Sequence, residues 1–308
     1  MIIYEAGPFI KWARKQRGVS QDELAESAGV ARVSISRIES GKQTPAKQTV
    51  DLLLQKLGYN PANLGIYLVS KEELEYQEAI DKINEHLSYE RVAEAQELIE
   101  SLAANEKFLN TSLNRQFLLL ARALLARKDG EGGAEETLGM LVEAIKINIP
   151  NFCEQKIPTY FLSRYDLKII NMMGIIYSEE DNLDKAIKIM AALKENFDRN
   201  SSDKDHQGKH LPLIITNLAK YLGMAGRHEE ALEICDEGIE ICRNTGFLFH
   251  LPSIAAGKAF NLHKLGREAE SLELFDQVYK SLILHGRKGL AKEVKDYVQK
   301  ELGGFIPD

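Results

Sequence analysis

The chain has 308 residues, enough for about two domains, and its 44% apolar and 28% charged residues are typical of globular proteins, which excludes a largely disordered chain. No apolar run of about 18 residues and no charged-then-apolar leader occurs, so we expect a cytoplasmic protein rather than a membrane or secreted one. The net charge of −7 divides into +3 on residues 1–70 and −10 on residues 71–308, which confines any affinity for nucleic-acid phosphates to the N-terminal part.

The N-terminal part shows the apolar spacing of short helices. Ile10 and Ala13 predict a first helix that ends at Gly18. Ser20 and Glu23 form a capping box at the start of a second helix, because each side chain can satisfy the exposed backbone N–H of the other. The inward side of this second helix carries Leu24, Ala25 and Ala28.

A glycine turn separates the second helix from a third. Gly29 supplies the positive φ that the turn requires, and Val30 fills the angle between the two helices. Ile35 and Ile38 point inward from the third helix. The residues left facing outward together are Arg32, Val33, Ser36 and Arg37.

This outward face has the chemistry of a DNA major-groove reader. Arginine can bind guanine O6 and N7 with two hydrogen bonds, and valine can contact a thymine methyl group. The alternative is an ordinary solvated helix face. The glycine turn, the capping box and the Ser40-Gly41-Lys42 run that follows the third helix favour DNA binding.

Residues 7–58 resemble the lambda-repressor-like helix-turn-helix of the Cro/XRE family, down to the Ser-Gln-x-Glu-Leu-Ala run at 20–25 and the Ile-Ser-Arg-Ile-Glu-Ser-Gly-Lys run at 35–42. The resemblance implies a partly buried pair between Arg14 and Glu39 that ties the first helix to the third. It implies base contacts from Arg32, Val33 and Arg37, with Ser36 on the same face, and phosphate contacts from Gln21, Ser40 and Lys42.

The N-terminal domain is expected to span residues 1–66. Thr44-Pro45 predicts the start of a fourth helix that runs through Leu57 and ends at Gly58. Asn60-Pro61 predicts the cap of a short fifth helix.

The second domain, residues 67–308, shows helical spacing throughout. Ser70 and Glu73 form another capping box, which predicts a helix that links the two domains. Three later segments align on one another, each with two small residues twelve positions apart, a spacing that lets antiparallel helices approach closely. These pairs are Gly174 with Ala186, Ala219 with Ala231 and Ala259 with Ser271, and the aligned turns hold Asp181, Gly226 and Gly266.

Helix pairs that recur every 40 to 45 residues predict a stacked superhelix. The segments resemble tetratricopeptide repeats with long helices. Looser pairs precede them at about 72–104 and 112–147, and residues 129–133 read as a connector rather than a phosphate loop, because no Gly-Lys-Ser/Thr follows. A helix from about 288 to 302 is expected to cap the stack. The whole chain is therefore predicted to be all-α.

First helices of such repeats line a concave groove, where asparagine amides can bind a peptide backbone. The alternative for each residue is a merely solvated side chain. The groove candidates are Arg115, Arg122, Asn171, Asn217, Lys220, Asn261 and His263.

A Cro-like domain joined to about five long repeat pairs resembles the RRNPP group of quorum-sensing, peptide-pheromone-responsive regulators, which includes PlcR-like and Rgg-like proteins. The resemblance implies a homodimer that binds a palindromic double-stranded operator, and a repeat domain that binds a short signalling peptide. Peptide binding would change the spacing of the two DNA-binding domains, with the helix from Ser70 as the lever. The chain departs from the repeat pattern at Ser271, where alanine is usual, and at Cys235, where an aromatic residue is common.

Enzyme and metal functions find little support. Asp203, Asp205, His206 and His210 could bind zinc in principle, but residues 200–209 are polar and read as a loop between repeats. No catalytic or cofactor motif occurs, so we expect no enzyme and no cofactor. Core packing is expected for Cys153, Cys235 and Cys242.

Two other functions compete with the peptide-gated regulator. The same concave surface could bind a protein partner. Alternatively, the chain could be a scaffold whose helix-turn-helix has lost its sequence preference.

Overall fold

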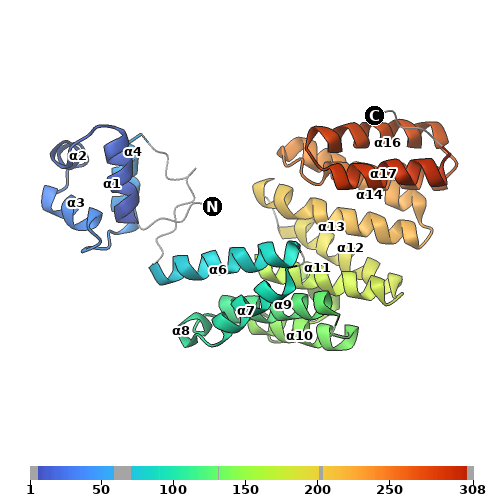
Figure 1. The fold of residues 1–308 in the computed structure, drawn as a ribbon, viewed down its shortest axis with the longest axis horizontal. Helices are drawn as coiled ribbons and strands as arrows, with labels where there is room; N and C mark the ends of the chain where they lie inside the picture. Colours follow the sequence, from blue (N-terminus) through green and yellow to red (C-terminus); the bar gives the residue numbers. More distant parts are fainter. Residues whose placement is uncertain (1–5, 59–70, 90, 131, 201–203, 304–308) are drawn as a thin grey trace. The chain divides into compact units, whose positions relative to one another are not determined.

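The computed structural model describes residues 6–58, 71–89, 91–130, 132–200 and 204–303. The chain forms two compact units, Met1–Phe108 and Leu109–Asp308. Every regular element in the described ranges is a helix (Figure 1), which confirms the predicted fold class. The predicted domain boundary at 66, the Asn60-Pro61 cap and the capping box at Ser70 lie outside the described residues.

The first four helices, here called the head, pack around one apolar core (Figure 1). They are α1 (Ala6–Gln16), α2 (Gln21–Ala28), α3 (Arg32–Glu39) and α4 (Lys47–Lys56). Ile10, Ala13 and Ile35 are fully buried there, and Leu24 and Ile38 nearly so, as their spacing predicted.

The turns of the head follow the predicted chemistry. The Ser20 hydroxyl accepts from the backbone N–H of Glu23 at 3.1 Å, and the Glu23 carboxylate accepts from that of Ser20 at 2.7 Å. Gly18 and Gly29 have φ angles of 65° and 64°, the left-handed region that glycine tolerates. The fourth helix starts later than predicted, because Ala46 is its N-cap.

The rest of the first unit is a helix pair with a short third helix. Helix α6 (Lys71–Ser88) packs against α7 (Val92–Ala103), which confirms the pair predicted at 72–104. Helix α8 (Glu106–Leu109) was not predicted. It is held by Tyr76, whose ring meets the buried Phe108 edge-on and whose hydroxyl donates to the Asn105 side chain at 3.2 Å.

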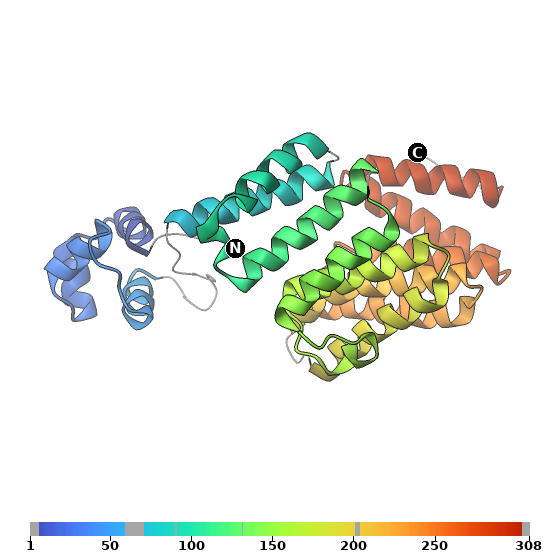
Figure 2. The same cartoon turned by 90° about the horizontal axis from the view of Figure 1, so that it is seen from below.

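The second unit stacks long antiparallel helices (Figure 2). Along the chain these are α9 (Ser112–Asp129), α10 (Ala134–Asn148), the 3₁₀ helix η1 (Glu154–Thr159), α11 (Arg164–Glu179), α12 (Leu183–Asn200), α13 (Lys204–Met224), α14 (His228–Thr245), α15 (Leu251–Lys264), α16 (Glu268–Leu284) and α17 (Lys288–Glu301). The predicted loop at 200–209 is wrong for its second half, because α13 already begins at Lys204.

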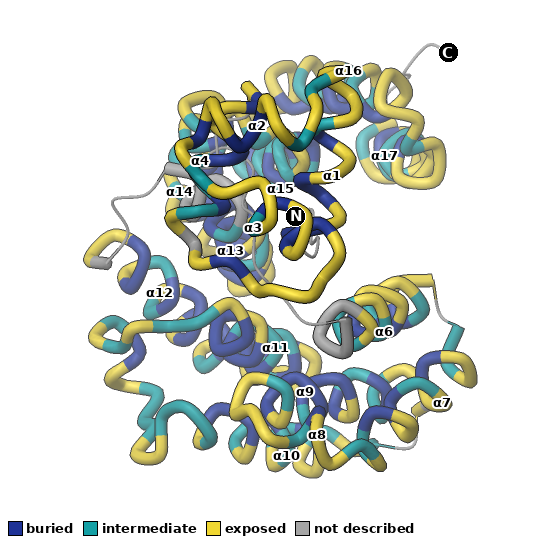
Figure 3. The backbone as a smooth tube through the Cα atoms, turned by 90° about the vertical axis from the view of Figure 1, so that its left-hand side faces the viewer, coloured by how far each residue is buried: buried dark blue, intermediate teal, exposed yellow. Residues whose placement is uncertain are grey.

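The stack of the second unit is curved (Figure 3). Helices α9, α11, α13 and α15 lie on the inner side of the arc, and α10, α12, α14 and α16 lie on the outer side. The inner helices also contact one another directly, α9 with α11, α11 with α13 and α13 with α15. The side of the arc formed by α9, α11, α13, α15 and α17 is called the inner face below.

The predicted small-residue pairs join the two helices of each repeat. Gly174, Ala186, Ala219, Ala231, Ala259 and Ser271 are all buried. At the departure from the pattern, the Ser271 hydroxyl donates to the backbone carbonyl of Ala259 at 2.7 Å, so the serine satisfies its own buried polar group. The aligned turn residues Asp181, Gly226 and Gly266 all have positive φ, between 56° and 76°.

The structure places the three cysteines and tests for metal-binding groups and membrane-spanning helices among the described residues. Cys235 and Cys242 are fully buried, as predicted, whereas Cys153 is only half-buried. Among the described residues no group of His, Cys, Asp and Glu side chains could hold a metal ion. None of the described helices combines the length and apolar character needed to cross a membrane.

Candidate DNA-reading head and ligand-binding face

Helix α3 presents its predicted outward residues to solvent. Arg32, Val33, Ser36 and Arg37 are all exposed, and Val33 has 59% of its surface accessible. Ile35 and Ile38 anchor the opposite side of the helix in the core. The result is a rigid helix with two cations and one exposed apolar side chain on the same face.

The buried Arg14–Glu39 pair is confirmed. Nε and one terminal nitrogen of Arg14 donate to the two Glu39 carboxylate oxygens at 2.6 and 2.9 Å, and its other terminal nitrogen donates to the Val19 carbonyl at 2.8 Å. Only 2% of the Glu39 side chain is exposed. Burial alone raises the pKa of Glu39, but hydrogen bonds from Arg14 and Gln21 and the Arg14 charge lower it below its ordinary value.

The Gln21 side chain, a predicted phosphate contact, already has a partner within the protein. Its side-chain N–H group donates to Glu39 at 2.8 Å, so the amide completes the bridge between α1, α2 and α3. A phosphate contact from Gln21 would therefore use its second side-chain N–H or the backbone N–H at the start of α2.

Arg32 forms an ion pair with Asp22 that was not predicted from the sequence. Its Nε lies 3.1 Å from an Asp22 carboxylate oxygen, and both side chains are more than 60% exposed. Exposed pairs of this kind contribute about 0.2–1 kcal/mol, so Arg32 can exchange Asp22 for a base at little cost. Only the arginine's chemistry was visible in the sequence, because Asp22 belongs to another helix.

The turn after α3 is organised by one carbonyl group. The backbone carbonyl of Arg37 accepts from the backbone N–H groups of Lys42 and Gln43, at 2.9 and 3.2 Å, and from the Ser40 hydroxyl at 3.2 Å. Gly41 has a φ of 72°, which permits this reversal. Ser40 and Lys42, the predicted phosphate contacts, are exposed just after the end of α3.

A close helix crossing fixes α3 against α1. Gly7 is buried at this crossing, and a β-carbon there would lie 2.0 Å from the backbone oxygen of Ile38. Backbone atoms cannot move away as a flexible side chain could. Gly7 was not singled out in the sequence, because the backbone that it approaches, at Ile38, belongs to another helix.

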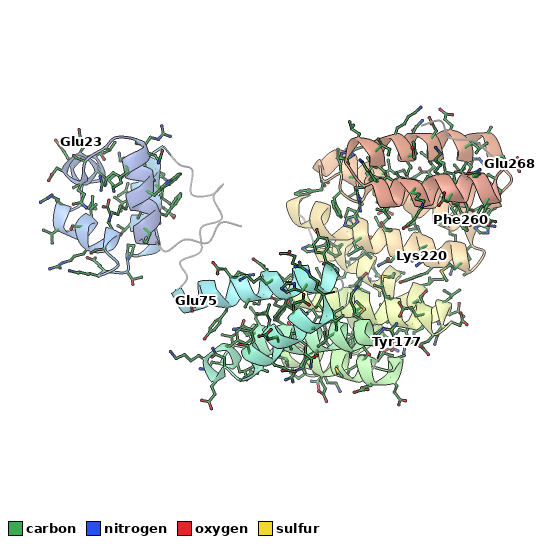
Figure 4. All side chains as sticks on the ribbon, viewed as in Figure 1. Glu23, Glu75, Tyr177, Lys220, Phe260 and Glu268 are labelled. Atoms are coloured by element: carbon green, nitrogen blue, oxygen red, sulfur yellow. The ribbon has the colours of Figure 1, made fainter. Side chains whose placement is uncertain are left out.

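In the second unit, the inner face brings two of the predicted asparagines together. The Asn217 amide on α13 donates to the Asn171 oxygen on α11 at 2.9 Å, and both side chains are half-buried. Lys220 of α13 is exposed one turn further on (Figure 4). Arg115 and Arg122 of α9 are exposed as well.

Two of the predicted groove residues, Asn261 and His263, are not freely exposed on the inner face. Asn261 is 1% exposed; its N–H donates to the Gly257 carbonyl at 2.8 Å, and its oxygen lies 2.9 Å from His228 Nδ1. Its amide therefore joins α14 to α15 and is not available to a ligand. His263 is half-buried, and its Nδ1 is enclosed without a hydrogen-bond partner.

Two protein families match parts of the chain. A helix-turn-helix family matches residues 10–64, which include most of the head. A tetratricopeptide repeat family matches residues 213–245, the α13–α14 pair. The curated HTH-type transcriptional regulator SinR of Bacillus licheniformis is 38% identical over 88 residues, which are 28% of this chain and 77% of SinR.

Solved structures match nearly the whole chain. Bacillus thuringiensis PlcR, in complex with the peptide PapR7 and DNA, has a TM-score of 0.66 at 21% identity and covers 93% of this chain and 98% of its own. The Streptococcus dysgalactiae SHP pheromone receptor Rgg2 has a TM-score of 0.65 at 15% identity, with coverage of 97% and 100%. ComR of S. thermophilus, in complex with DNA and its signalling peptide ComS, has a TM-score of 0.55 at 15% identity, with coverage of 94% and 97%. These likenesses establish a shared fold.

Proposed function

Because the chain belongs to the helix-turn-helix transcription regulators, we propose that it binds a specific operator and that a short signalling peptide on the inner face of its repeat domain controls this binding. One combination carries the proposal: a head with an exposed reading face and a repeat stack with a polar inner face belong to the same chain. PlcR and ComR, which share the fold, have each been crystallised with both DNA and a peptide.

In the head, Arg32, Val33, Ser36 and Arg37 would contact bases. Gln21, Ser40 and Lys42 would contact phosphates. The Arg14–Glu39 pair supports this division, since it fixes α3 to α1 without using any of the proposed base-contacting side chains.

In the repeat domain, Asn171, Asn217 and Lys220 would form the centre of the peptide site, with Arg115 and Arg122 on the neighbouring helix α9. Asparagine can both donate to and accept from a peptide backbone, so it binds main chain regardless of sequence. Asn261 is left out because its amide is already used, and His263 would contribute only after a change of rotamer.

The operator would be palindromic and the protein a homodimer, because two heads must reach half-sites about 34 Å apart for each helical turn of DNA. The proposal is tested in two steps. Selection of random duplexes by the full chain should enrich one palindrome. Calorimetry should then detect binding of short exported peptides encoded beside the gene, and scrambled versions should not bind. Enrichment of no sequence would favour a scaffold with a degenerate head.

A protein partner on the repeat domain is a second candidate, and one observation favours it. Exposed apolar side chains occur in the turn after α14, at the end of α16 and at the start of α17, and Arg287 connects these segments by donating to the Phe249 carbonyl at 3.2 Å. The apolar residues are Leu248, Phe249, Ile283, Leu284 and Leu290. Loss of partner capture in a Phe249→Ser, Leu284→Ser variant, with peptide binding absent, would favour this function over the first.

A further inference from the structure

The last repeats contain an apolar pocket that the proposed peptide site does not use. Its volume is about 310 Å³, and it opens between α15 and α17 over one residue of α16. The ring of Tyr297 forms one wall, 6.0 Å from the ring of Phe260 and 5.5 Å from that of Phe275. The remaining lining residues are Ala256, Glu293 and Val294.

Helix register places this pocket on the inner face. Phe260 directly follows Ala259, as Lys220 follows Ala219 one repeat earlier, so the two side chains occupy equivalent positions of neighbouring inner helices (Figure 4). Five of the six lining residues come from α15 and α17. A ligand lying along the inner face from α13 would therefore reach the pocket at α15.

The charges around the pocket differ on its two sides. Lys264 is exposed, with its ammonium nitrogen 5.4 Å from the centre of the Phe260 ring, and Lys220 lies on the adjacent α13. Glu293 lies on the α17 side of the pocket. These two cations contrast with the net charge of −10 on residues 71–308. They favour a ligand carboxylate beside them.

We infer that the inner face selects an acidic peptide that places one aromatic or branched apolar side chain in the Phe260–Tyr297 pocket and a carboxylate beside Lys220 and Lys264. This inference rests on the proposed function, because it specifies the chemistry of the peptide. An apolar side chain gains from leaving water for the pocket, and the lysines reject cationic ligands.

The test uses the full chain and four pools of fluorescein-labelled heptapeptides in an alanine, serine and glycine background. The first pool carries one phenylalanine and two aspartates. The second replaces both aspartates by lysine, the third replaces phenylalanine by alanine, and the fourth makes both changes. Fluorescence anisotropy should show at least tenfold tighter binding of the first pool than of the second, and at least fivefold tighter binding than of the third.

Variants of the chain assign each preference to its residues. Ala256→Leu fills the pocket and should remove the preference for phenylalanine while keeping that for aspartate; Val294→Phe serves the same purpose if the first variant does not fold. Lys264→Gln should weaken the preference for aspartate. The matched controls are Ala225→Leu, in an exposed turn, and Lys188→Gln, on the outer helix α12, and both should leave the two preferences intact.

The outcomes separate this inference from the proposed function. Equal binding of all four pools, or tighter binding of the lysine pool, would overturn the inference and leave peptide binding standing. Preferences that persist in Ala256→Leu, Val294→Phe and Lys264→Gln would overturn the assigned site. If no pool binds, the inference fails together with the proposal that the repeats bind a peptide.

Discussion

In the proposed function, some residues of the head contact DNA and others hold helix α3 in place. We expect Arg37→Ala to cost about 1–3 kcal/mol on the operator and to relax specificity at one base, because a bidentate contact to guanine is lost. Lys42→Ala should weaken all DNA alike and reduce the salt slope by about 0.9, the share of one phosphate. Titrations by anisotropy at several salt concentrations measure both effects.

Lys56→Ala is the control for this pair of variants, since Lys56 is exposed on α4, away from the reading helix in sequence. It should change neither specificity nor salt slope appreciably. Equal losses on operator and random DNA for Arg37→Ala would remove Arg37 from the set of base contacts.

Glu39 makes the stability of the head depend on pH. Its pKa in the folded state lies below the ordinary value that it would have in an unfolded chain. The stabilisation is therefore complete above that unfolded value and is lost as the pH falls through the lower, folded value. Glu39→Gln should flatten this part of the stability curve, and removal of one partner of a buried pair should cost about 3–5 kcal/mol.

Denaturant unfolding of the head, followed through its single tryptophan, Trp12, between pH 3 and pH 7 measures the Glu39 effect. Glu26→Gln, on the exposed side of α2, is the matched control. A Glu39→Gln variant that kept the full pH dependence of the wild type would contradict this account.

How far a residue's role could be predicted depended on where its partner lies. The capping box was readable because Ser20 and Glu23 are three residues apart. The Arg14–Glu39 pair followed from family resemblance. The burial of Asn261 was missed, because its partner His228 is 33 residues away on another helix.

At the scale of whole helices, the close crossing of α1 and α3 gives a direct test of how the head packs. Gly7→Ala places a methyl group against the Ile38 backbone, so α1 must move away from α3. We expect a loss of at least about 1–3 kcal/mol, the usual cost of overpacking a core. Thermal unfolding monitored by circular dichroism measures it.

Gly139→Ala is the matched control for Gly7→Ala and should raise the stability of the protein instead of lowering it. Gly139 is exposed in the middle of α10, and a β-carbon added there would meet no atom within 4 Å, so alanine should add up to about 1 kcal/mol through helix propensity. If both alanines raised stability, the close approach of α1 to α3 would be wrong.

Helix pairs with regular small residues could be predicted from the sequence, and irregular segments could not. The spacing of twelve placed α11 to α16 correctly, because close packing of two helices constrains residue size at fixed positions. Helices α8 and η1 left no such pattern. The segment around η1 is instead held by the Asn196 amide of α12, which donates to the carbonyls of Ile157 and Tyr160 at 2.8 and 2.7 Å.

At the scale of the whole molecule, the N-terminal part, which contains the head, is basic, and the rest of the chain is acidic. Residues 1–70 carry a net charge of +3 and residues 71–308 one of −10, which favours contact of DNA phosphates with the N-terminal part. In the proposed homodimer, the repeat domain would influence DNA binding through its effect on the two heads. A ligand that prefers one curvature of the repeat stack would change their spacing and so the affinity for two half-sites.

Coupling between the two sites tests this account most directly. Calorimetry of the full chain with the phenylalanine–aspartate pool, with and without saturating operator duplex, gives the peptide affinity in both states. We expect the operator to change this affinity about 5- to 150-fold, and the peptide to change operator affinity by the same factor, since coupling free energies are reciprocal. A peptide that binds with the same affinity whether or not the operator is bound would contradict it.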